Sequence, residues 1–411
     1  MRIAPTPYVA VVGAALSANK GAASMLLALA DNIDEVVPGG RLVSLSTYPQ
    51  ADGREAGASK IDIVDYRPRT MVLLHLPLAI LAGIARLLGG SGRTFMRTRA
   101  LRVLRDAEVV ADLAGISFSD GRGLPTLVYN SLMTGIPLMI GAPVVKCSQA
   151  IGPLQRFDTR LAARLVLPRL NRVVARGRGT FDHLESFGLS NVVEGSDLAF
   201  LMDTDENDDQ TAGGFVDDLS SGFFLVSASS VVEELCDREG IDYPRLMADL
   251  VMRLVAETGL SAVLVAHSAR PGHPKSRMND LPVISEIGEL LSDAKVKAVE
   301  ESLDPRVLRA LIARSEFLLA SRFHAMISGL ATGTPTVVVG WSHKYREVMQ
   351  EFGLEDFVVA FSEFNVETLV EISTTAWQRR GDVSNQIQAA LPTVRDSAKT
   401  SLRSLMAAAN A

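Results

Sequence analysis

Short apolar runs alternate with helical stretches along the second half of the chain, and this alternation constrains the fold most. The runs typical of buried strands are Phe223–Val226, Ala262–Ala266, Phe317–Ala320, Thr336–Val339 and Phe357–Ala360. Stretches with helical periodicity lie near Tyr243–Thr258, Leu281–Leu291, Pro305–Arg314, Phe323–Thr332, Lys344–Phe352 and Val366–Arg379. Strands that alternate with helices form a parallel sheet covered on both faces. The pattern therefore predicts a doubly wound α/β domain.

The first half of the chain carries the same alternation. A helix is predicted from Gly21 to Asn32. The predicted strands are Tyr8–Val12, Leu42–Leu45, Val109–Leu113, Pro137–Ile140 and Val173–Ala175. At 411 residues and 47% hydrophobic content, the chain is long enough and apolar enough for two cores. We therefore expect an α/β fold of two facing Rossmann-like domains, with a ligand cleft where the carboxyl ends of their strands meet.

An acidic segment marks the expected domain boundary. Seven of the sixteen residues from Asp203 to Asp218 are acidic, a composition that indicates a solvated linker. The predicted domains are an N-terminal one over residues 1–205 and a C-terminal one over residues 206–385. Residues 386–411 are predicted to form a C-terminal helical tail.

Charge and cysteine content exclude several classes of protein. A net charge of −6 argues against nucleic-acid binding, which needs a concentrated basic face. Cys147 and Cys236 are too few for a disulfide scaffold or a zinc ribbon. No His, Cys or carboxylate spacing suits a metal, so neither a structural nor a catalytic metal is expected. The first ten residues lack the build of a signal peptide, and a cytoplasmic location is expected.

The run from Met71 to Leu88 is almost continuously apolar and has three interpretations. A membrane span is the least favoured, because the run is slightly shorter than the roughly 20 residues that a span needs and contains His75, Pro77 and Arg86. The first interpretation is a buried or loosely packed helical segment, and the second is a patch that touches the inner face of the membrane. The second interpretation is favoured by the basic residues that follow, Arg93, Arg97, Arg99 and Arg102.

The segment after the predicted strand Phe317–Ala320 carries most of the functional information. Ser321 is expected to cap the next helix, which places Arg322 and His324 in its first turn. A helix N-terminus presents free N–H groups and a positive dipole end, so cations there need an anionic ligand to explain them. Arg322 can bind a carboxylate or phosphate with two parallel bonds, and His324 can exchange a proton near neutral pH.

Structural roles are the alternative for these two residues. Arg322 could pair with Glu316, and His324 could be a hydrogen-bonded core histidine. Lys344 lies at the corresponding turn one strand later, and three basic side chains at neighbouring turns favour the functional interpretation.

These residues resemble the polysaccharide pyruvyl transferase family. The similar signature is Ser321-Arg322-Phe323-His324-Ala325, followed by Gly333-Thr334-Pro335 and Lys344. Weaker similar stretches, in chain order, are Asn19-Lys20-Gly21-Ala22, Ser148–Pro153, Ala175-Arg176 with Phe187-Gly188-Leu189, Ser196–Phe200, and His267 with Asn279-Asp280-Leu281. The resemblance spans Val9 to Asp356. Ala22 and Leu198 depart from it, because the family has Asp and Pro at these places.

The resemblance implies a glycosyltransferase-B-like architecture and a pyruvyl transfer, with the acceptor side on residues 1–205 and the donor side on residues 206–385. The donor would be phosphoenolpyruvate, a co-substrate, with no further cofactor. The acceptor would be a sugar or lipid-linked sugar of a cell-surface polysaccharide, glycolipid or precursor, and the product a pyruvate ketal. His324 would be the general acid that protonates the enol carbon, and Arg322 would hold the anionic donor.

Further residues are candidates for binding, each with a structural alternative. Those expected to support the donor are Lys344, Arg176, Ser229 and His267. Those expected at the acceptor or in the cleft are Asn19, Asp197 and Asp280. The alternative is an N-cap for Asn19 and Asp280, a turn cap for Asp197 and an ion pair for Arg176.

Two other functions stay open on the sequence. One is a glycosyltransferase of the same fold with a nucleotide-sugar donor, and the other is a non-catalytic protein that binds a sugar or a partner. Stabilisation by phosphoenolpyruvate, by a nucleotide sugar or by neither would separate the three. The sequence does not fix the oligomeric state, and a homo-oligomer is compatible with it.

Overall fold

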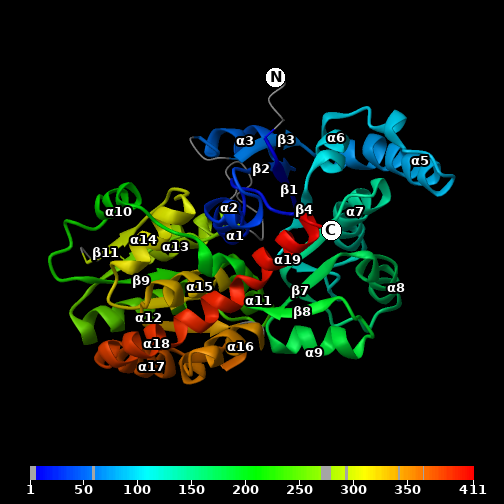
Figure 1. The fold of residues 1–411 in the computed structure, drawn as a ribbon. Helices are drawn as coiled ribbons and strands as arrows, with labels where there is room; N and C mark the ends of the chain where they lie inside the picture. Colours follow the sequence, from blue (N-terminus) through cyan, green and yellow to red (C-terminus); the bar gives the residue numbers. More distant parts are fainter. Residues whose placement is uncertain (1–5, 58–60, 270–278, 292–294, 341–342, 364) are drawn as a thin grey trace. The chain divides into compact units, whose positions relative to one another are not determined.

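A computed structural model describes residues 6–57, 61–269, 279–291, 295–340, 343–363 and 365–411. The chain forms two compact units (Figure 1). The N-terminal unit consists of Met1–Ser17, Met25–Met202 and Arg395–Ala411, and the C-terminal unit of Ala18–Ser24 and Asp203–Val394. The boundary after Met202 lies close to the predicted one after residue 205. Two groupings differ from the prediction, because residues 18–24 belong to the C-terminal unit and residues 395–411 to the N-terminal unit.

The N-terminal unit is built on a parallel sheet with the strand order β3-β2-β1-β4-β6-β7-β8. A short strand, β5 (Ile116–Ser117), pairs with β6. The bounds are β1 Tyr8–Val12, β2 Arg41–Ser46, β3 Ile61–Asp65, β4 Val109–Asp112, β6 Val144–Ile151, β7 Arg172–Arg176 and β8 Val192–Gly195. The strand order reverses between β1 and β4, which makes this pair the switch point of the sheet.

Helices cover this sheet, and one of them replaces a predicted strand. The helices are α1 Lys20–Asp31, α2 Ile33–Val36, α3 Pro49–Glu55, α4 Pro68–Thr70, α5 Leu76–Leu87, α6 Arg99–Asp106, α7 Leu124–Ile140, α8 Phe157–Val166, α9 Arg178–Ser186 and α19 Thr400–Ala409. The strand predicted at Pro137–Ile140 is wrong, because these residues end α7. A short apolar run cannot by itself be distinguished from a buried helix segment.

The C-terminal helix α19 explains why the end of the chain belongs to the N-terminal unit. It packs on β4, β6, β7 and β8. The Ser401 hydroxyl lies 2.8 Å from that of Ser148 on β6, and both residues are fully buried. The last helix therefore covers the N-terminal sheet instead of forming a separate tail.

The C-terminal unit has a second parallel sheet, in the order β11-β10-β9-β12-β13-β14. Its strands are β9 Phe223–Ser227, β10 Ser261–Leu264, β11 Val296–Ala298, β12 Leu318–Ala320, β13 Thr336–Gly340 and β14 Val358–Ala360. The order reverses between β9 and β12, and ligands of such sheets bind at the carboxyl ends of the strands at this point. The predicted fold class of two Rossmann-like parallel-sheet domains is confirmed.

The helices of this unit match the predicted stretches closely, except that no helix was predicted at Ser230–Arg238. They are α11 Ser230–Arg238, α12 Tyr243–Thr258, α13 Leu281–Leu290, α14 Pro305–Ala313, α15 Phe323–Thr332, α16 His343–Glu351, α17 Val366–Gln378 and α18 Arg380–Ala398. All five residues of β9 and of β13 are buried, as expected for central strands covered on both faces.

The acidic segment expected to be a solvated linker contains a helix, α10 (Glu206–Gly213). Asp205 and Asp208 form a reciprocal capping box at its N-terminus. Asp209 accepts two hydrogen bonds of 2.8 Å from Arg314 at the end of α14. The acidic residues therefore cap and anchor a helix that packs against α14, so the linker interpretation is wrong.

Candidate functional site

The turn between β12 and α15 forms the centre of the candidate site. The helix begins at Phe323, so Arg322 is its N-cap residue, with extended backbone and a side chain that does not cap the helix. Ser321, the predicted cap, lies one residue earlier and its hydroxyl contacts the Tyr243 hydroxyl at 3.3 Å. The first-turn N–H groups of α15 thus lie at the carboxyl end of β12, next to the switch point of the sheet.

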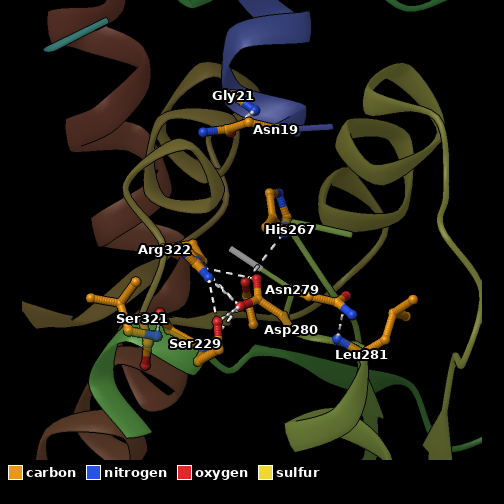
Figure 2. Close-up of polar contacts among 12 residues, drawn as sticks. Asn19, Gly21, Ser229, His267, Asn279, Asp280, Leu281, Ser321 and Arg322 are labelled. Carbon is orange, nitrogen blue, oxygen red and sulfur yellow. Dashed lines mark hydrogen bonds and ion pairs between the residues drawn. The ribbon is translucent and has the colours of Figure 1, made fainter. Parts of the chain in front are cut away.

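Arg322 is held by a buried carboxylate, Asp280 (Figure 2). Its Nε donates to Asp280 Oδ2 at 2.9 Å and to Oδ1 at 3.1 Å, and its Nη2 donates to Asp280 Oδ1 and, at 3.0 Å, to the Ser230 hydroxyl. The expected alternative of a pair with Glu316 is wrong, since Glu316 pairs with Arg380 at 2.7 Å. The guanidinium is therefore fixed along its Nε–Nη2 edge, and Nη1 lies outside these contacts.

Asp280 joins three elements and does not act as the cap that the sequence also allowed. It precedes α13, but its side chain makes no bond to that helix. Instead Oδ1 accepts hydrogen bonds from the backbone N–H of Ser230 at 3.0 Å and from its hydroxyl at 3.1 Å. Asn279 supplies the contact to α13, where its Oδ1 accepts from Leu281 N at 3.4 Å. Asp280 therefore ties the start of α11 to the Arg322 turn.

His267 lies beside this pair, after β10, and is buried. Its Nδ1 is 3.2 Å from the hydroxyl of Ser227, the last residue of β9. Burial lowers the pKa of His267 to about 3, and nearby positive charge adds to the effect. The positive groups that contribute are His324, Arg322, Arg309 and Lys20. His267 is therefore neutral at pH 7, and its surroundings are electropositive although the protein is acidic overall.

His324, in the first turn of α15, lies against the N-terminus of α1. A Cβ atom added to Gly21 would lie 2.0 Å from His324 Nδ1 and 2.4 Å from its Cγ. Only glycine therefore leaves room for the imidazole at this place. Asn19 caps α1, since its Oδ1 accepts a hydrogen bond from Gly21 N at 2.9 Å. The backbone of Asn19 also forms an isolated antiparallel β-bridge with Ser268, the residue after His267. In Figure 2, His267 lies between Asn19 and Gly21 on one side and the Arg322–Asp280 pair on the other.

Lys344 completes the group of basic side chains. Its Nζ lies 4.9 Å from the centre of the Phe323 ring, and Phe323 is the residue between Arg322 and His324. Tyr345 fixes the start of α16, because its hydroxyl donates to the Ser321 carbonyl at 3.4 Å. The structure thus brings Arg322, His324 and Lys344 to one edge of the C-terminal sheet.

Three other predicted residues have clear structural contacts. Ser229 caps α11, with its hydroxyl oxygen accepting from Val231 N at 3.2 Å. Arg176 Nη1 pairs with Asp197 Oδ2 at 2.6 Å, and both side chains are buried. Asp197 Oδ1 also accepts from Ala199 N at 2.9 Å, which caps the turn that follows.

The ligand roles predicted for these residues stay predictions, as do those of Asn19, His267 and Asp280. Arg176 and Asp197 lie in the N-terminal unit and pair with each other, whereas the group around Arg322 lies in the C-terminal unit.

Sequence reasoning missed a buried polar group at the switch point of the N-terminal sheet. Asp112, which ends β4, accepts a 2.5 Å bond from Lys146 on β6 and a 2.8 Å bond from the Gln149 amide. All three residues are almost fully buried, and burial lowers the pKa of Lys146 while Asp112 opposes this. The available signal was a lysine inside an otherwise apolar strand.

Among the residues that the structure describes, no group of three or more His, Cys, Asp or Glu side chains gathers as metal ligands would. The expectation of a reaction without metal stays a prediction.

The solved structures that resemble the chain define its class of fold. UDP-GlcNAc 2-epimerase from Neisseria meningitidis, bound to UDP-GlcNAc, matches 98% of this chain and 100% of its own, with a TM-score of 0.64 and 12% identity. The S. aureus MnaA–UDP structure matches 94% of this chain and 91% of its own, with a TM-score of 0.58 and 14% identity. At such identity the likeness shows the fold alone, that of two-domain α/β proteins of the glycosyltransferase-B type.

The sequence comparison gives the family within that class. A sequence model of the polysaccharide pyruvyl transferase family matches residues 19–343, which is most of the chain and includes Arg322 and His324 but ends one residue before Lys344. The chain therefore belongs to the polysaccharide pyruvyl transferase family. A curated relative, amylovoran biosynthesis protein AmsJ of Erwinia amylovora, is 25% identical over 266 residues. That match covers 62% of this chain and 61% of the relative, so it spans less than two thirds of the relative's length.

Proposed function

We propose that the protein transfers a pyruvyl group from phosphoenolpyruvate to a sugar of a cell-surface polysaccharide or its precursor, forming a pyruvate ketal. One observation carries the proposal. In a member of this family, Arg322, His324 and Lys344 gather at the N-terminus of α15, at the switch point where such sheets bind ligands. Phosphoenolpyruvate carries a carboxylate and a phosphate, and this group of cations and free N–H groups suits such an anion.

The pairing of Arg322 with Asp280 fits a role in positioning. Asp280 occupies the Nε–Nη2 edge, so the donor would meet Nη1 together with the first-turn N–H groups of α15. A guanidinium fixed by a buried carboxylate does not have to reorganise when the anion binds, and such preorganised charge is effective at a reacting centre. Lys344, held over Phe323, would add the further positive charge that the phosphate needs.

The proton donor in this proposal is His324. His267 is held neutral by burial, so it cannot deliver a proton at pH 7. His324 is partly exposed and lies in the same helix turn as the proposed donor site. His267 would instead offer a hydrogen bond without adding charge, with its ring oriented by the Ser227 hydroxyl.

The reaction follows from these roles. His324 gives a proton to the CH₂ carbon of phosphoenolpyruvate, which makes the neighbouring carbon electrophilic. A sugar hydroxyl attacks that carbon and loses its proton, the carbon–oxygen bond to phosphate breaks, and inorganic phosphate leaves. A second hydroxyl attacks the same carbon and closes the ketal. One phosphoenolpyruvate and two hydroxyl groups thus give one pyruvate ketal and one phosphate, without any oxidant or reductant.

Ligand-induced stabilisation tests the proposal before the acceptor is known. Phosphoenolpyruvate at a hundred times its Kd should stabilise the protein by about 2.7 kcal/mol, seen as a rise in Tm. Arg322→Lys should lose most of this rise, because lysine lacks the planar fork. Arg245→Lys, on an exposed arginine of the same unit, is the matched control. A rise with UDP-sugars and none with phosphoenolpyruvate would favour a glycosyltransferase, and no rise with either would favour a non-catalytic binding protein.

A further inference from the structure

Helix α5 and the turns before it expose one apolar face. The helical stretch Pro68–Leu87 is 20 residues long and is long and apolar enough to cross a membrane. Its inner side, with Met71, Ala79 and Ala82, belongs to the core of the N-terminal unit. Its outer side carries exposed apolar side chains, Val72, Leu73, Leu74, Ile80, Leu81, Ile84, Leu87 and Leu88. The sequence left open a buried segment or a membrane-surface patch, and the structure shows a helix buried on one side only.

The apolar surface does not end at α5. Helix α7 packs against α5, and α8 packs against α7, so the three follow one another in the N-terminal unit (Figure 1). Between α7 and α8 lies an open, almost wholly apolar groove of about 340 Å³. Its exposed apolar residues are Leu124, Val128, Phe157, Leu161 and Leu165. Phe157 is 81% exposed and Leu87 is 88% exposed, values unusual for such large apolar side chains in water.

Arginines surround this apolar surface, in a protein whose net charge is negative. Residues 66–105 contain eight arginines and no aspartate or glutamate. Those exposed near α5 include Arg69, Arg93, Arg97, Arg99 and Arg102. Those exposed on or beside α8 are Arg156, Arg160, Arg164 and Arg169. An apolar helix face bordered by basic residues is the pattern of proteins that lie in the interface of an anionic bilayer.

We infer that the face formed by α5, α7 and α8 docks the protein on the surface of an anionic lipid bilayer. The apolar side chains enter the region between headgroups and acyl chains, and the arginines contact the lipid phosphates. A second copy of this chain would fit the surface less well, because a two-fold contact would place the arginines of one copy near those of the other. The inference does not depend on the proposed pyruvyl transfer, since it concerns neither Arg322 nor His324.

The contacts on the inner side of α5 favour docking on the surface of the bilayer over spanning it. His75 is buried there and stacks on Tyr66 with ring centres 5.1 Å apart. The Arg86 Nη1 group donates to the Ile140 carbonyl at the end of α7 at 2.6 Å. Spanning the bilayer would break these contacts and expose part of the core of the unit.

Vesicle flotation of the full chain tests the inference. The protein should float with vesicles of phosphatidylcholine and phosphatidylglycerol, and much less with phosphatidylcholine alone. Leu73→Glu/Leu87→Glu should abolish flotation, whereas Leu290→Glu, at an exposed leucine of the C-terminal unit, should leave it unchanged. Arg93→Ala/Arg97→Ala should weaken partition about 25-fold, at about fivefold for each arginine, and added salt should weaken it as well.

Three results would overturn the inference. The first is absence of flotation with anionic vesicles while phosphoenolpyruvate still raises the Tm. The second is a dimer in light scattering that Leu73→Glu/Leu87→Glu converts to a monomer without any lipid binding, since the face would then be a subunit interface. The third is protein that stays in the vesicles after alkaline carbonate extraction, which indicates a spanning helix. Circular dichroism and the Tm of the double variant establish that it is folded.

Discussion

The contact between Gly21 and His324 gives the sharpest prediction from the structure. In Gly21→Ala the new Cβ would lie 2.0 Å from His324 Nδ1, 2.4 Å from Cγ and 2.6 Å from Cε1. Ordinary contacts between such atoms are about 3.5–4.0 Å, so the imidazole or the start of α1 has to move by more than about 1 Å. The change is one methyl group and touches no charge.

Gly21→Ala is expected to change the stability of the protein little but to lower its activity strongly. Alanine is better than glycine inside a helix by up to about 1 kcal/mol, so a variant that adjusts easily should be as stable as the wild type or more so. A displacement of about 1 Å in a catalytic group costs about 10²-fold in rate. We therefore expect Gly21→Ala to stay folded, with a change in stability of at most about 1–2 kcal/mol, and to lose roughly a hundredfold in turnover.

The assay is phosphate release from phosphoenolpyruvate in the presence of a sugar acceptor, measured alongside urea unfolding. Gly381→Ala is the matched control, because its added Cβ meets no atom within 4 Å and it also lies in a helix of the C-terminal unit. The control should keep full turnover. Full turnover in Gly21→Ala would refute the claim that His324 must keep its position. Loss of folding in Gly21→Ala alone would show that the contact serves stability.

Three further predictions test the site. His324→Gln should fold and keep most of its affinity for phosphoenolpyruvate, but its turnover rate should fall by about 10²–10⁴-fold. Arg322→Lys should lose affinity as well as rate. Near wild-type turnover of His324→Gln would show that His324 is not the acid. Asp280→Ala should lower the free energy of unfolding by about 3–5 kcal/mol, because Arg322 stays buried without its carboxylate. The double variant Asp280→Ala/Arg322→Met should recover much of this loss. Urea unfolding that shows the same loss in the single and the double variant would contradict this explanation. The pKa of His267 is about 3 in the folded protein and about 6.5 in the unfolded chain. The contribution of the neutral imidazole to folding stability is therefore fully present above pH 6.5 and is lost as the pH falls below it. Lowering the pH from 7 to 5 should therefore reduce the free energy of unfolding by about 2 kcal/mol through His267. If His267→Gln loses as much stability over this pH range as the wild type, the assignment is contradicted.

The fold was predictable because its strands and helices are determined by short stretches of sequence. Buried strands such as Phe223–Val226 read as unbroken apolar runs, and helices such as Tyr243–Thr258 carry strong periodicity and a capping Asp242. The errors came where a local signal had two meanings. Pro137–Ile140 is apolar enough for a strand but ends a buried helix, and the acidic run near Asp209 is a capped helix anchored by an arginine about a hundred residues away.

The candidate site was predictable in its residues but not in its partners. Arg322 and His324 were found from the strand–helix turn, because that turn fixes where their backbone lies. The pairing of Arg322 with Asp280 depends on how α13 returns to the sheet, which no local pattern specifies. In the same way Gly21 lies some three hundred residues from His324, and the sequence shows it only as a small residue at a predicted helix start.

Proton incorporation from solvent tests the central claim most directly. The protein, phosphoenolpyruvate and a precursor sugar acceptor are incubated in D₂O, and the product is analysed by NMR and mass spectrometry. The account predicts a pyruvate ketal whose methyl group carries one deuterium, formed together with one inorganic phosphate, and formed far more slowly by His324→Gln. Phosphate found on the sugar, or phosphoenolpyruvate left unconsumed with every acceptor of this class while a UDP-sugar is turned over, would contradict it.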